Sequence, residues 1–263
     1  MQEKQGRSIW IVGADTDLGA QVAKVLAPSH TLALSGYDAD AIRAVSHACQ
    51  RLSNVPESSK DYVLTGTGEV VDFEAIAQAV MADVSKIDTV IFLPPSLDKP
   101  APLLETSSQQ LQGCLQSYVS AAHNLALALE KPFLTQAFGQ LTVVSGIAGW
   151  IAGPQTTAEA FAHNALQHFT ACLYTAWQPL GLRVQLVNPG YIHHKSMAAN
   201  TMDYPFLMDA ETAAQQIVNN LSSTNFVVNF PKVLAFAVKL RNLIPLTFPR
   251  HLQKLMKRLC RKS

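Results

Sequence analysis

The stretch "SIWIVGADTDLGAQVAKVLA", residues 8–27, places a strand, a tight loop and a helix one after another. Residues 8–13 form an apolar run of strand length, and residues 18–27 repeat apolar side chains at helical spacing. The loop between them offers three candidate caps for the helix, Asp15, Thr16 and Asp17. This order of elements is typical of an α/β fold.

The same alternation continues to residue 230. Further strands are predicted at 31–35, 61–65, 88–93, 139–146, 182–188 and 225–230, and further helices at 39–52, 72–86, 106–130, 153–177 and 210–221. Near-continuous apolar strands between helices predict a doubly wound parallel sheet, a single Rossmann-like α/β domain over 1–230 with helices on both faces. Ligands bind such sheets beyond the carboxyl ends of the strands, so the expected site lies in the loops 13–19, 35–38, 93–96, 145–150 and 189–196.

The composition excludes several classes of protein. The formal net charge is +1, so no field for nucleic acid is implied. The four cysteines lack metal-binding spacing and are interpreted as reduced thiols. We expect no signal peptide and no membrane-spanning segment. We therefore expect a cytoplasmic protein.

The loop "VGADTDLGA", residues 12–20, resembles the cofactor loop of the short-chain dehydrogenase/reductase family. The first and last glycines of that loop are Gly13 and Gly19, whereas the middle glycine is replaced by Asp17. The middle glycine lets the backbone approach a pyrophosphate, so Asp17 costs space and adds charge repulsion. Helix capping alone also accounts for the polar residues of this loop.

The resemblance covers residues 7–230. It continues through "VIFLPPSLDKPAPLLE" (90–105), "VVSGIAG" (143–149), "NALQHFT" (164–170) and "LGLRVQLVNPGYI" (180–192). It implies NAD or NADP as the cofactor. The cofactor-binding positions that it implies are Gly13, Thr16, Asp17, Leu18, Gly19, Ser35, Tyr37, Glu69, Leu93, Pro94, Pro189, Gly190 and Ile192.

All four catalytic positions implied by the resemblance carry other residues. The family's Ser falls on Gly146, its Tyr on Glu159, its Lys on His163 and its Asn on Ser117. In the family Tyr transfers a proton, Lys lowers the pKa of that Tyr and Ser orients the carbonyl. Ser145 precedes the Ser position by one residue, and alternation along a strand predicts that it points to the opposite face.

Three functions follow as hypotheses. The first is a family homologue without NAD(P)-dependent oxidoreductase activity, which binds a ligand or a partner. The second is an active oxidoreductase of a small carbonyl or alcohol substrate, with His163 or Glu159 as an unusual proton donor. The third is non-redox acid–base chemistry by Glu159 and His163, which lie four residues apart on one helix face.

Glu159 also has a structural interpretation. Thr156 and Glu159 match a capping box, with Thr156 as the N-cap. His163 then serves as a packed helix residue, and His193 and His194 as loop residues. A metal held by Glu159, His163 and one of these loop histidines is the alternative. Ser145 lacks the G-x-S-x-G elbow of a serine hydrolase.

The C-terminal segment 231–263 is basic and amphipathic. From Lys232 onward it holds nine Lys and Arg and no acidic residue, which leaves 11 basic and 19 acidic residues, a net charge of −8, in the rest of the chain. Pro245 and Pro249 divide the segment into two helical pieces. We expect its apolar face to dock on the protein, with peripheral contact to an anionic membrane as the alternative.

Apolar residues also cover much of the helices predicted at 106–130 and 155–177. They include Leu125, Leu129, Ala158, Phe161, Leu166 and Phe169. By the resemblance these helices pair between subunits of a homodimer or homotetramer. Packing within one chain would give the same pattern.

Overall fold

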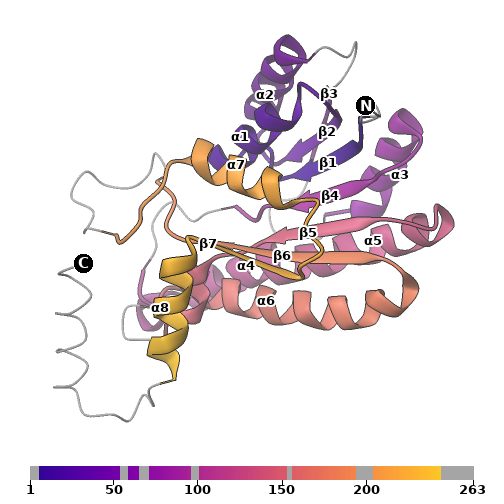
Figure 1. The fold of residues 1–263 in the computed structure, drawn as a ribbon. Coiled ribbons are helices and arrows are strands. Elements are labelled where there is room, and N and C mark those ends of the chain that lie inside the picture. Colours follow the sequence, from indigo (N-terminus) through magenta and orange to yellow (C-terminus); the bar gives the residue numbers. More distant parts are fainter. Residues whose placement is uncertain are drawn as a thin grey trace, which may run out of the picture.

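The computed structural model describes residues 6–53, 59–64, 71–95, 101–152, 156–193 and 204–243. In these ranges seven strands form one parallel sheet in the order β3-β2-β1-β4-β5-β6-β7 (Figure 1). The strands are β1 (Ser8–Val12), β2 (Thr31–Gly36), β3 (Ser59–Val63), β4 (Thr89–Phe92), β5 (Gln140–Val144), β6 (Arg183–Pro189) and β7 (Val227–Phe230). The predicted doubly wound sheet is confirmed, and its strand order reverses between β1 and β4.

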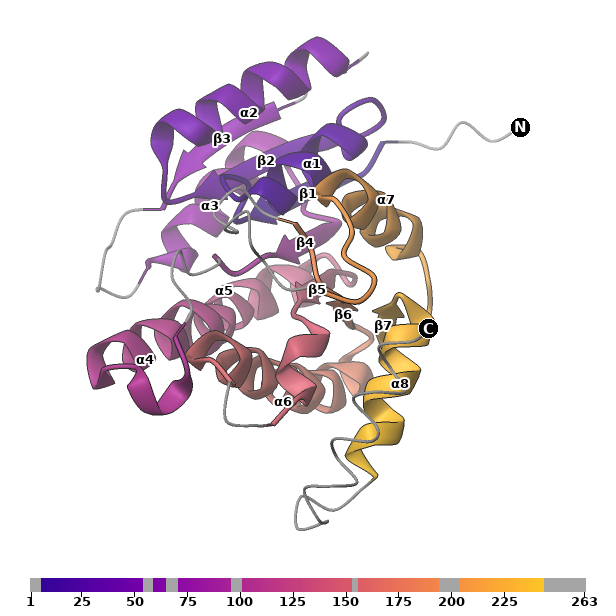
Figure 2. The ribbon, with the colours of Figure 1, turned by 90° about the vertical axis from the view of Figure 1, so that its left-hand side faces the viewer.

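Helices cover both faces of the sheet (Figures 1 and 2). One face carries α1 (Asp17–Leu26), α2 (Ala39–Leu52) and α7 (Ala210–Asn220). The other carries α3 (Phe73–Val84), α4 (Ser108–Leu115), α5 (Ala121–Thr135) and α6 (Ala158–Trp177). Each face has its own hydrophobic core, because neighbouring strand residues point to opposite sides: Trp10 belongs to one core and Ile11 to the other.

The helix predicted at 106–130 is interrupted. A π-helical turn, η2 (Gln116–Ser120), separates α4 from α5, and α5 continues to Thr135. The spacing of apolar residues along the chain predicted a continuous helix. A π turn adds only one residue to a helix, so it changes this spacing too little to be recognised from the sequence. Such turns occur frequently at functional sites. The turn carries Ser117, the position of the family's Asn.

Helix α6 begins one residue later than the predicted capping box requires. Its N-cap is Thr157, whose hydroxyl accepts a hydrogen bond from the amide of Ala160 at 3.1 Å. The Thr156 hydroxyl instead donates to the carbonyl of Ile151 at 3.0 Å. The predicted capping box with Thr156 as N-cap is therefore wrong, because either of two adjacent threonines could start the helix and the loop before it selects the second.

The first piece of the C-terminal segment forms α8 (Lys232–Asn242). Its buried side chains, Leu234, Ala235 and Val238, pack against Ile147, Trp150, Ile151 and Tyr191. The expected docking on the protein is thus observed for this helix. Residues 244–263, with Pro245 and Pro249, lie outside the described residues. None of the helices in the described ranges is long and apolar enough to cross a membrane.

Candidate functional site

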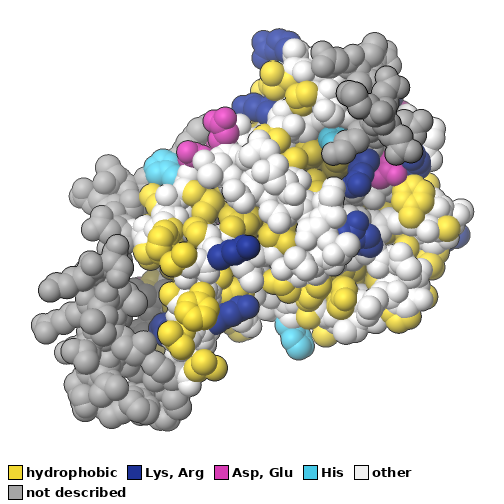
Figure 3. All heavy atoms as spheres, viewed as in Figure 1, with side chains coloured by type: hydrophobic (Ala, Val, Ile, Leu, Met, Phe, Trp, Pro, Cys, Tyr) yellow, Lys and Arg dark blue, Asp and Glu magenta, His cyan; other side chains and the backbone are white. Residues whose placement is uncertain are grey.

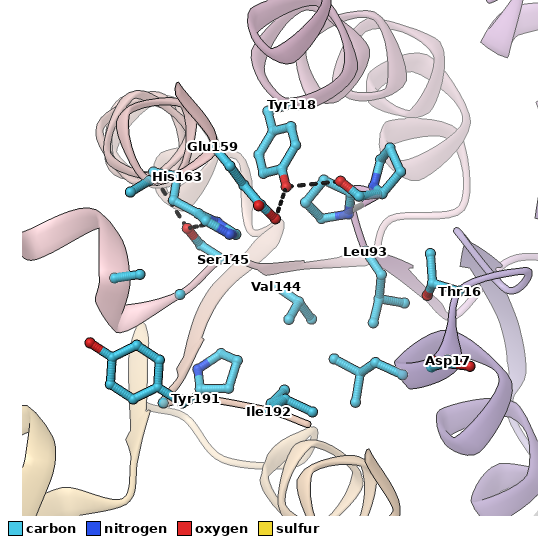
Figure 4. Close-up of a pocket in the computed structure, with 18 of the residues that line it drawn as sticks. Thr16, Asp17, Leu93, Tyr118, Val144, Ser145, Glu159, His163, Tyr191 and Ile192 are labelled. Carbon is cyan, nitrogen blue, oxygen red and sulfur yellow. Dashed lines mark hydrogen bonds between the residues drawn. The ribbon is translucent and has the colours of Figure 1, made fainter. Parts of the chain in front are cut away.

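A cleft of ≈ 500 Å³ opens at the carboxyl ends of β1, β4, β5 and β6 (Figure 4). Its walls come from the loop 15–18, the end of β4 at 93–95, the turn 144–148 after β5, the start of α6, and the segment 189–193. Four of the five loops expected to form the site meet here. The fifth, 35–38, supplies none of the lining in the described part of the chain.

The loop after β1 is held by its own residues. Thr16 caps α1: its hydroxyl accepts from the amide of Gly19 at 3.0 Å and donates to the carbonyl of Gly13 at 2.8 Å. Thr16 is thus the cap among the three candidates. This closes the loop into a tight turn without any ligand.

The two retained glycines have packing roles. Gly13 has φ +93°, and a Cβ there would lie 2.0 Å from the carbonyl oxygen of Leu93. A Cβ on Gly19 would lie 2.0 Å from the carbonyl oxygen of Gly13. Both positions therefore require glycine for the turn and for the close contact of loop, helix and strand.

Asp17 stands at the position that, by the resemblance, contacts a pyrophosphate in the family. Asp17 lines the cleft as the first residue of α1. Figure 4 shows its side chain directed away from the centre of the cleft, so the obstacle at this position is the Cβ and the negative charge. A helix N-terminus attracts anions, and Asp17 places a carboxylate there already.

A second carboxylate occupies the end of β2. Asp15 accepts hydrogen bonds from the amides of Tyr37 at 2.7 Å and Asp38 at 3.0 Å. A Cβ on Gly36 would lie 2.1 Å from its carboxylate oxygen. Ser35 is buried and accepts from the indole of Trp10 at 2.9 Å. The backbone groups at the end of β2 are therefore bonded within the chain.

The Tyr position of the family forms a polar pair with a tyrosine from another helix. The Tyr118 hydroxyl lies 2.9 Å from Glu159 Oε1 and 2.8 Å from the carbonyl oxygen of Pro95, and it shares its one proton between these acceptors. Burial, with the neighbouring Glu159, raises the pKa of Tyr118 well above its usual value. Tyr118 holds its proton tightly.

The Lys position forms a second polar group. Ser145 Oγ lies 3.1 Å from His163 Nδ1 and 3.1 Å from the His163 carbonyl oxygen. Gln167 donates to Ser145 Oγ at 3.2 Å and to the Gly146 carbonyl at 2.8 Å, and it accepts from the Trp150 indole. Ser145 therefore contacts helix α6, against the prediction from strand alternation. The reason is that β5 ends at Val144.

His163 is neutral in this setting. Burial lowers the pKa of its imidazole to about 4. The ring packs edge-on against Tyr118, with 4.9 Å between the centroids. A Cβ on Gly146 would lie 3.5 Å from His163 Nε2, so the imidazole faces the position of the family's Ser. At the position that the resemblance assigns to the family's Lys, this chain therefore has an uncharged ring.

The remaining predicted residues fall into three groups. Leu18, Leu93, Pro94, Pro189, Gly190 and Ile192 line the cleft and make its floor largely apolar. The described lining takes Tyr118 from the π turn rather than its neighbour Ser117. Glu69 and His194 lie outside the described residues.

No metal site is found within the described ranges, where no group of three or more His, Cys, Asp or Glu side chains could hold an ion. This contradicts the set of Glu159 and His163 with His193. The backbone of His193 bonds Met208 at 2.8 Å.

A dinucleotide does not fit this cleft in the way the family holds one. Among the described residues that line it there is no Lys or Arg, whereas Asp15, Asp17 and Glu159 are acidic. A pyrophosphate would meet carboxylates at the helix N-terminus without a compensating cation. The amides beyond β2, next to the ribose position, are taken by Asp15.

Sequence reasoning missed Tyr118, Gln167 and the role of Asp15. Tyr118 and Glu159 are 41 residues apart, and Gln167 and Ser145 are 22 apart. The spacing of His163 and Gln167, four residues apart on the side of α6 that contacts Ser145 and Gly146, was the one available signal.

A family model described as short chain dehydrogenase matches residues 7–204. Dehydrogenase/reductase SDR family member 7B of Xenopus laevis is 24% identical over 192 residues, which cover 72% of this chain and 59% of that protein. The chain therefore spans less than two thirds of that relative's length.

Solved structures give the same fold. A short-chain type dehydrogenase/reductase from Mycobacterium ulcerans has a TM-score of 0.77 and 16% identity, covering 86% of this chain and 88% of that one. A short chain dehydrogenase/reductase from Burkholderia phymatum in complex with NAD has a TM-score of 0.77 and 15% identity, covering 92% and 95%. At these identities the likeness establishes the fold alone.

Proposed function

The chain belongs to the short-chain dehydrogenase/reductase family, and we propose that it is a member without the family's hydride transfer, which uses the retained cleft to bind a small molecule other than NAD(P). One observation carries the proposal. Gly13 and Gly19, which the fold needs for packing, are kept, and the glycine that serves the cofactor is replaced by Asp17.

The proton-transfer positions support the same proposal. The family's mechanism needs a cation beside a tyrosine to lower the pKa of its hydroxyl. Here His163, with its pKa lowered to about 4, supplies no cation at neutral pH. Tyr118 bonds to Glu159 instead, and the pKa of Tyr118 is raised. Both differences oppose release of a proton.

The cleft itself remains suited to a ligand. Its volume, ≈ 500 Å³, falls in the range of small-molecule sites. Leu18, Leu93 and Ile192 offer apolar contact, and the Tyr118–Glu159 and Ser145–His163 pairs offer polar contact at one end. The absence of Lys and Arg from the described lining favours a neutral or cationic molecule over a polyanion.

Titration with NADH and NADPH tests the proposal. Calorimetry and nicotinamide fluorescence are expected to show no saturable binding up to about millimolar cofactor, equivalent to a binding free energy weaker than about −4 kcal/mol. Micromolar binding would overturn the proposal. A fluorescent-probe screen, with ligands competing for an uncharged apolar dye such as Nile red at the cleft, then tests whether the cleft binds other small molecules.

A second candidate is an oxidoreductase with an unusual proton donor. The observation that favours it is the Tyr118 hydroxyl, which lies at the cleft wall 2.9 Å from the side chain at the family's Tyr position. NADPH consumption with a panel of aldehydes and ketones, lost in Tyr118→Phe, would support this candidate. Activity retained in Tyr118→Phe would exclude Tyr118 as the donor.

A homodimer or homotetramer in the cytoplasm is the expected setting. Of the apolar residues on the two long helices, Leu125, Leu129, Ala158 and Leu166 are buried within the chain. Other residues remain for a subunit contact: Leu127 on α5 is 59% exposed and Phe161 on α6 is 42% exposed. Light scattering of the purified protein measures the subunit number.

A further inference from the structure

Helix α8 has two apolar faces, and within the described part of the chain one of them packs on the protein while the other does not. Leu234, Ala235 and Val238 form the inner face against Ile147, Trp150, Ile151 and Tyr191. The contact is close: a Cβ on Gly190 would lie 2.9 Å from a methyl group of Leu234. Asn242 donates to the Trp150 carbonyl at 2.8 Å. The orientation of α8 about its own axis is therefore set by the inner face.

The outer face is an apolar stripe. Val233, Phe236, Leu240 and Leu243 recur at helical spacing and are 63%, 69%, 52% and 79% exposed. At about 3.6 residues per turn these positions lie opposite the inner face. Figure 3 shows hydrophobic side chains gathered on the surface over α8, with Lys and Arg beside them. A surface helix that only covers the protein would carry polar residues here.

Every charged residue of α8 is basic. By helical spacing Lys232 and Lys239 follow one edge of the outer stripe, and Arg241 lies at the other edge. Lys239 lies over the Trp150 ring at 5.4 Å and Arg241 donates to the Ala152 carbonyl at 3.3 Å, so both are anchored beside the stripe. The sequence from Lys232 to its end contains no Asp or Glu.

We propose that the outer stripe of α8, Val233, Phe236, Leu240 and Leu243, docks on the surface of an anionic phospholipid membrane. An exposed apolar stripe between basic residues matches the interfacial helices that lie in the headgroup region. The apolar side chains insert, and the Lys and Arg side chains meet anionic headgroups. The helix lies on the membrane and does not cross it.

Charge argues against a second copy of the chain as the occupant. In a two-fold contact the same stripe faces itself, so Lys and Arg from both copies would come together around an apolar centre. The acidic residues that could compensate lie elsewhere on the chain, since α8 has none. A membrane with anionic lipid supplies the opposite charge directly.

Vesicle flotation of the full chain tests the proposal. Vesicles of phosphatidylcholine alone are compared with vesicles that also contain phosphatidylglycerol. The wild type is expected to float with the anionic vesicles, less so at high salt. Phe236→Asp with Leu240→Asp is expected to weaken binding at least about tenfold. Leu104→Asp with Leu180→Asp places the same two charges on leucines outside α8 that are 99% and 46% exposed, and this variant is expected to bind as the wild type does.

Other occupants give other results. A second copy on the stripe would give an oligomer that the Phe236→Asp, Leu240→Asp variant dissociates in light scattering, with no vesicle binding by the wild type. Coverage by residues 244–263 would lower the melting temperature of that variant, again without vesicle binding. Either result overturns the proposal, and so does equal binding of variant and wild type. None of these results depends on cofactor binding.

Discussion

His163→Gln is expected to remove a pH-dependent part of the stability. Burial lowers the pKa of His163 to about 4 in the folded chain, from 6.5 as its ordinary value. The unfolded chain therefore binds a proton below pH 6.5 that the folded chain refuses, and stability falls as pH falls from about 6.5 to about 4. Between pH 7.5 and pH 5 these two pKa values give a loss of at most about 2 kcal/mol from this one group.

Urea unfolding at pH 7.5 and pH 5 measures the effect. A loss of about 2 kcal/mol moves the wild-type midpoint down by roughly 1 M urea. Carboxylates and other histidines contribute to the total, so the quantity of interest is the difference between wild type and variant. His168→Gln, at an exposed position five residues later on α6, is the matched control and should keep the wild-type pH dependence.

The outcome decides the charge at the family's Lys position. If His163→Gln loses as much stability between pH 7.5 and pH 5 as the wild type, then His163 takes up a proton in the folded chain. The ring would then carry a charge in the folded chain, and Tyr118 would have a cation beside it. If the stability of His163→Gln depends less on pH than that of the wild type, and the stability of His168→Gln does not, then the His163 ring is neutral in the folded chain and supplies no cation beside Tyr118.

Three further predictions concern the loop and the helix ends. Gly19→Ala should lower the free energy of unfolding by about 1–3 kcal/mol in urea unfolding, because its Cβ would lie 2.0 Å from a backbone oxygen. The control is Gly113→Ala in α4, where space is open around the glycine, and it should raise the free energy of unfolding by up to about 1 kcal/mol. Equal effects at the two sites would contradict the packing role of Gly19. Asp17→Gly should give saturable NADH binding below about millimolar cofactor in fluorescence titration, where the wild type shows none, since space and charge are both relieved; no saturable binding by the variant would mean that the other features of the cleft dominate. Thr157→Ala should cost about 1 kcal/mol by loss of the α6 cap, and an unaltered melting temperature would argue against that cap.

The fold was predictable because its signals are local. Each strand is a short apolar run, and each helix repeats apolar residues at its own period, so nearest neighbours along the chain carry the information. Helix α2 was predicted with the bounds that it has, 39–52, because Asp38 caps it and its amphipathic pattern is strong. The N-cap of α6 was predicted one residue too early, at Thr156 instead of Thr157. The two threonines are equally good caps, and only the tertiary contact of Thr156 with Ile151 decides between them.

The contacts of the site were not predictable in the same way. The partner of Glu159 comes from the π turn, and a turn that inserts one residue changes which side chain faces the cleft. Without it Ser117 is the expected neighbour; with it Tyr118 lines the cleft. The bond from Asp15 to the amides beyond β2 likewise joins segments whose proximity exists only in the folded sheet.

The motif residues that this chain retains have one property in common, and it explains why the resemblance to the family's motifs is only partial. Gly13 and Gly19 are enclosed by backbone, and Gly190 lies against Leu234 of α8 and Pro231. Each would cost packing energy to replace, whether or not a ligand binds. By the resemblance, Asp17, Gly146, Glu159 and His163 stand at the positions with which family members contact cofactor or substrate. A chain without hydride transfer must still keep the residues that folding needs. It need not keep the residues that only the chemistry needs. This pattern of kept and lost positions therefore follows from the proposed function, and an active enzyme would need a separate reason for each loss.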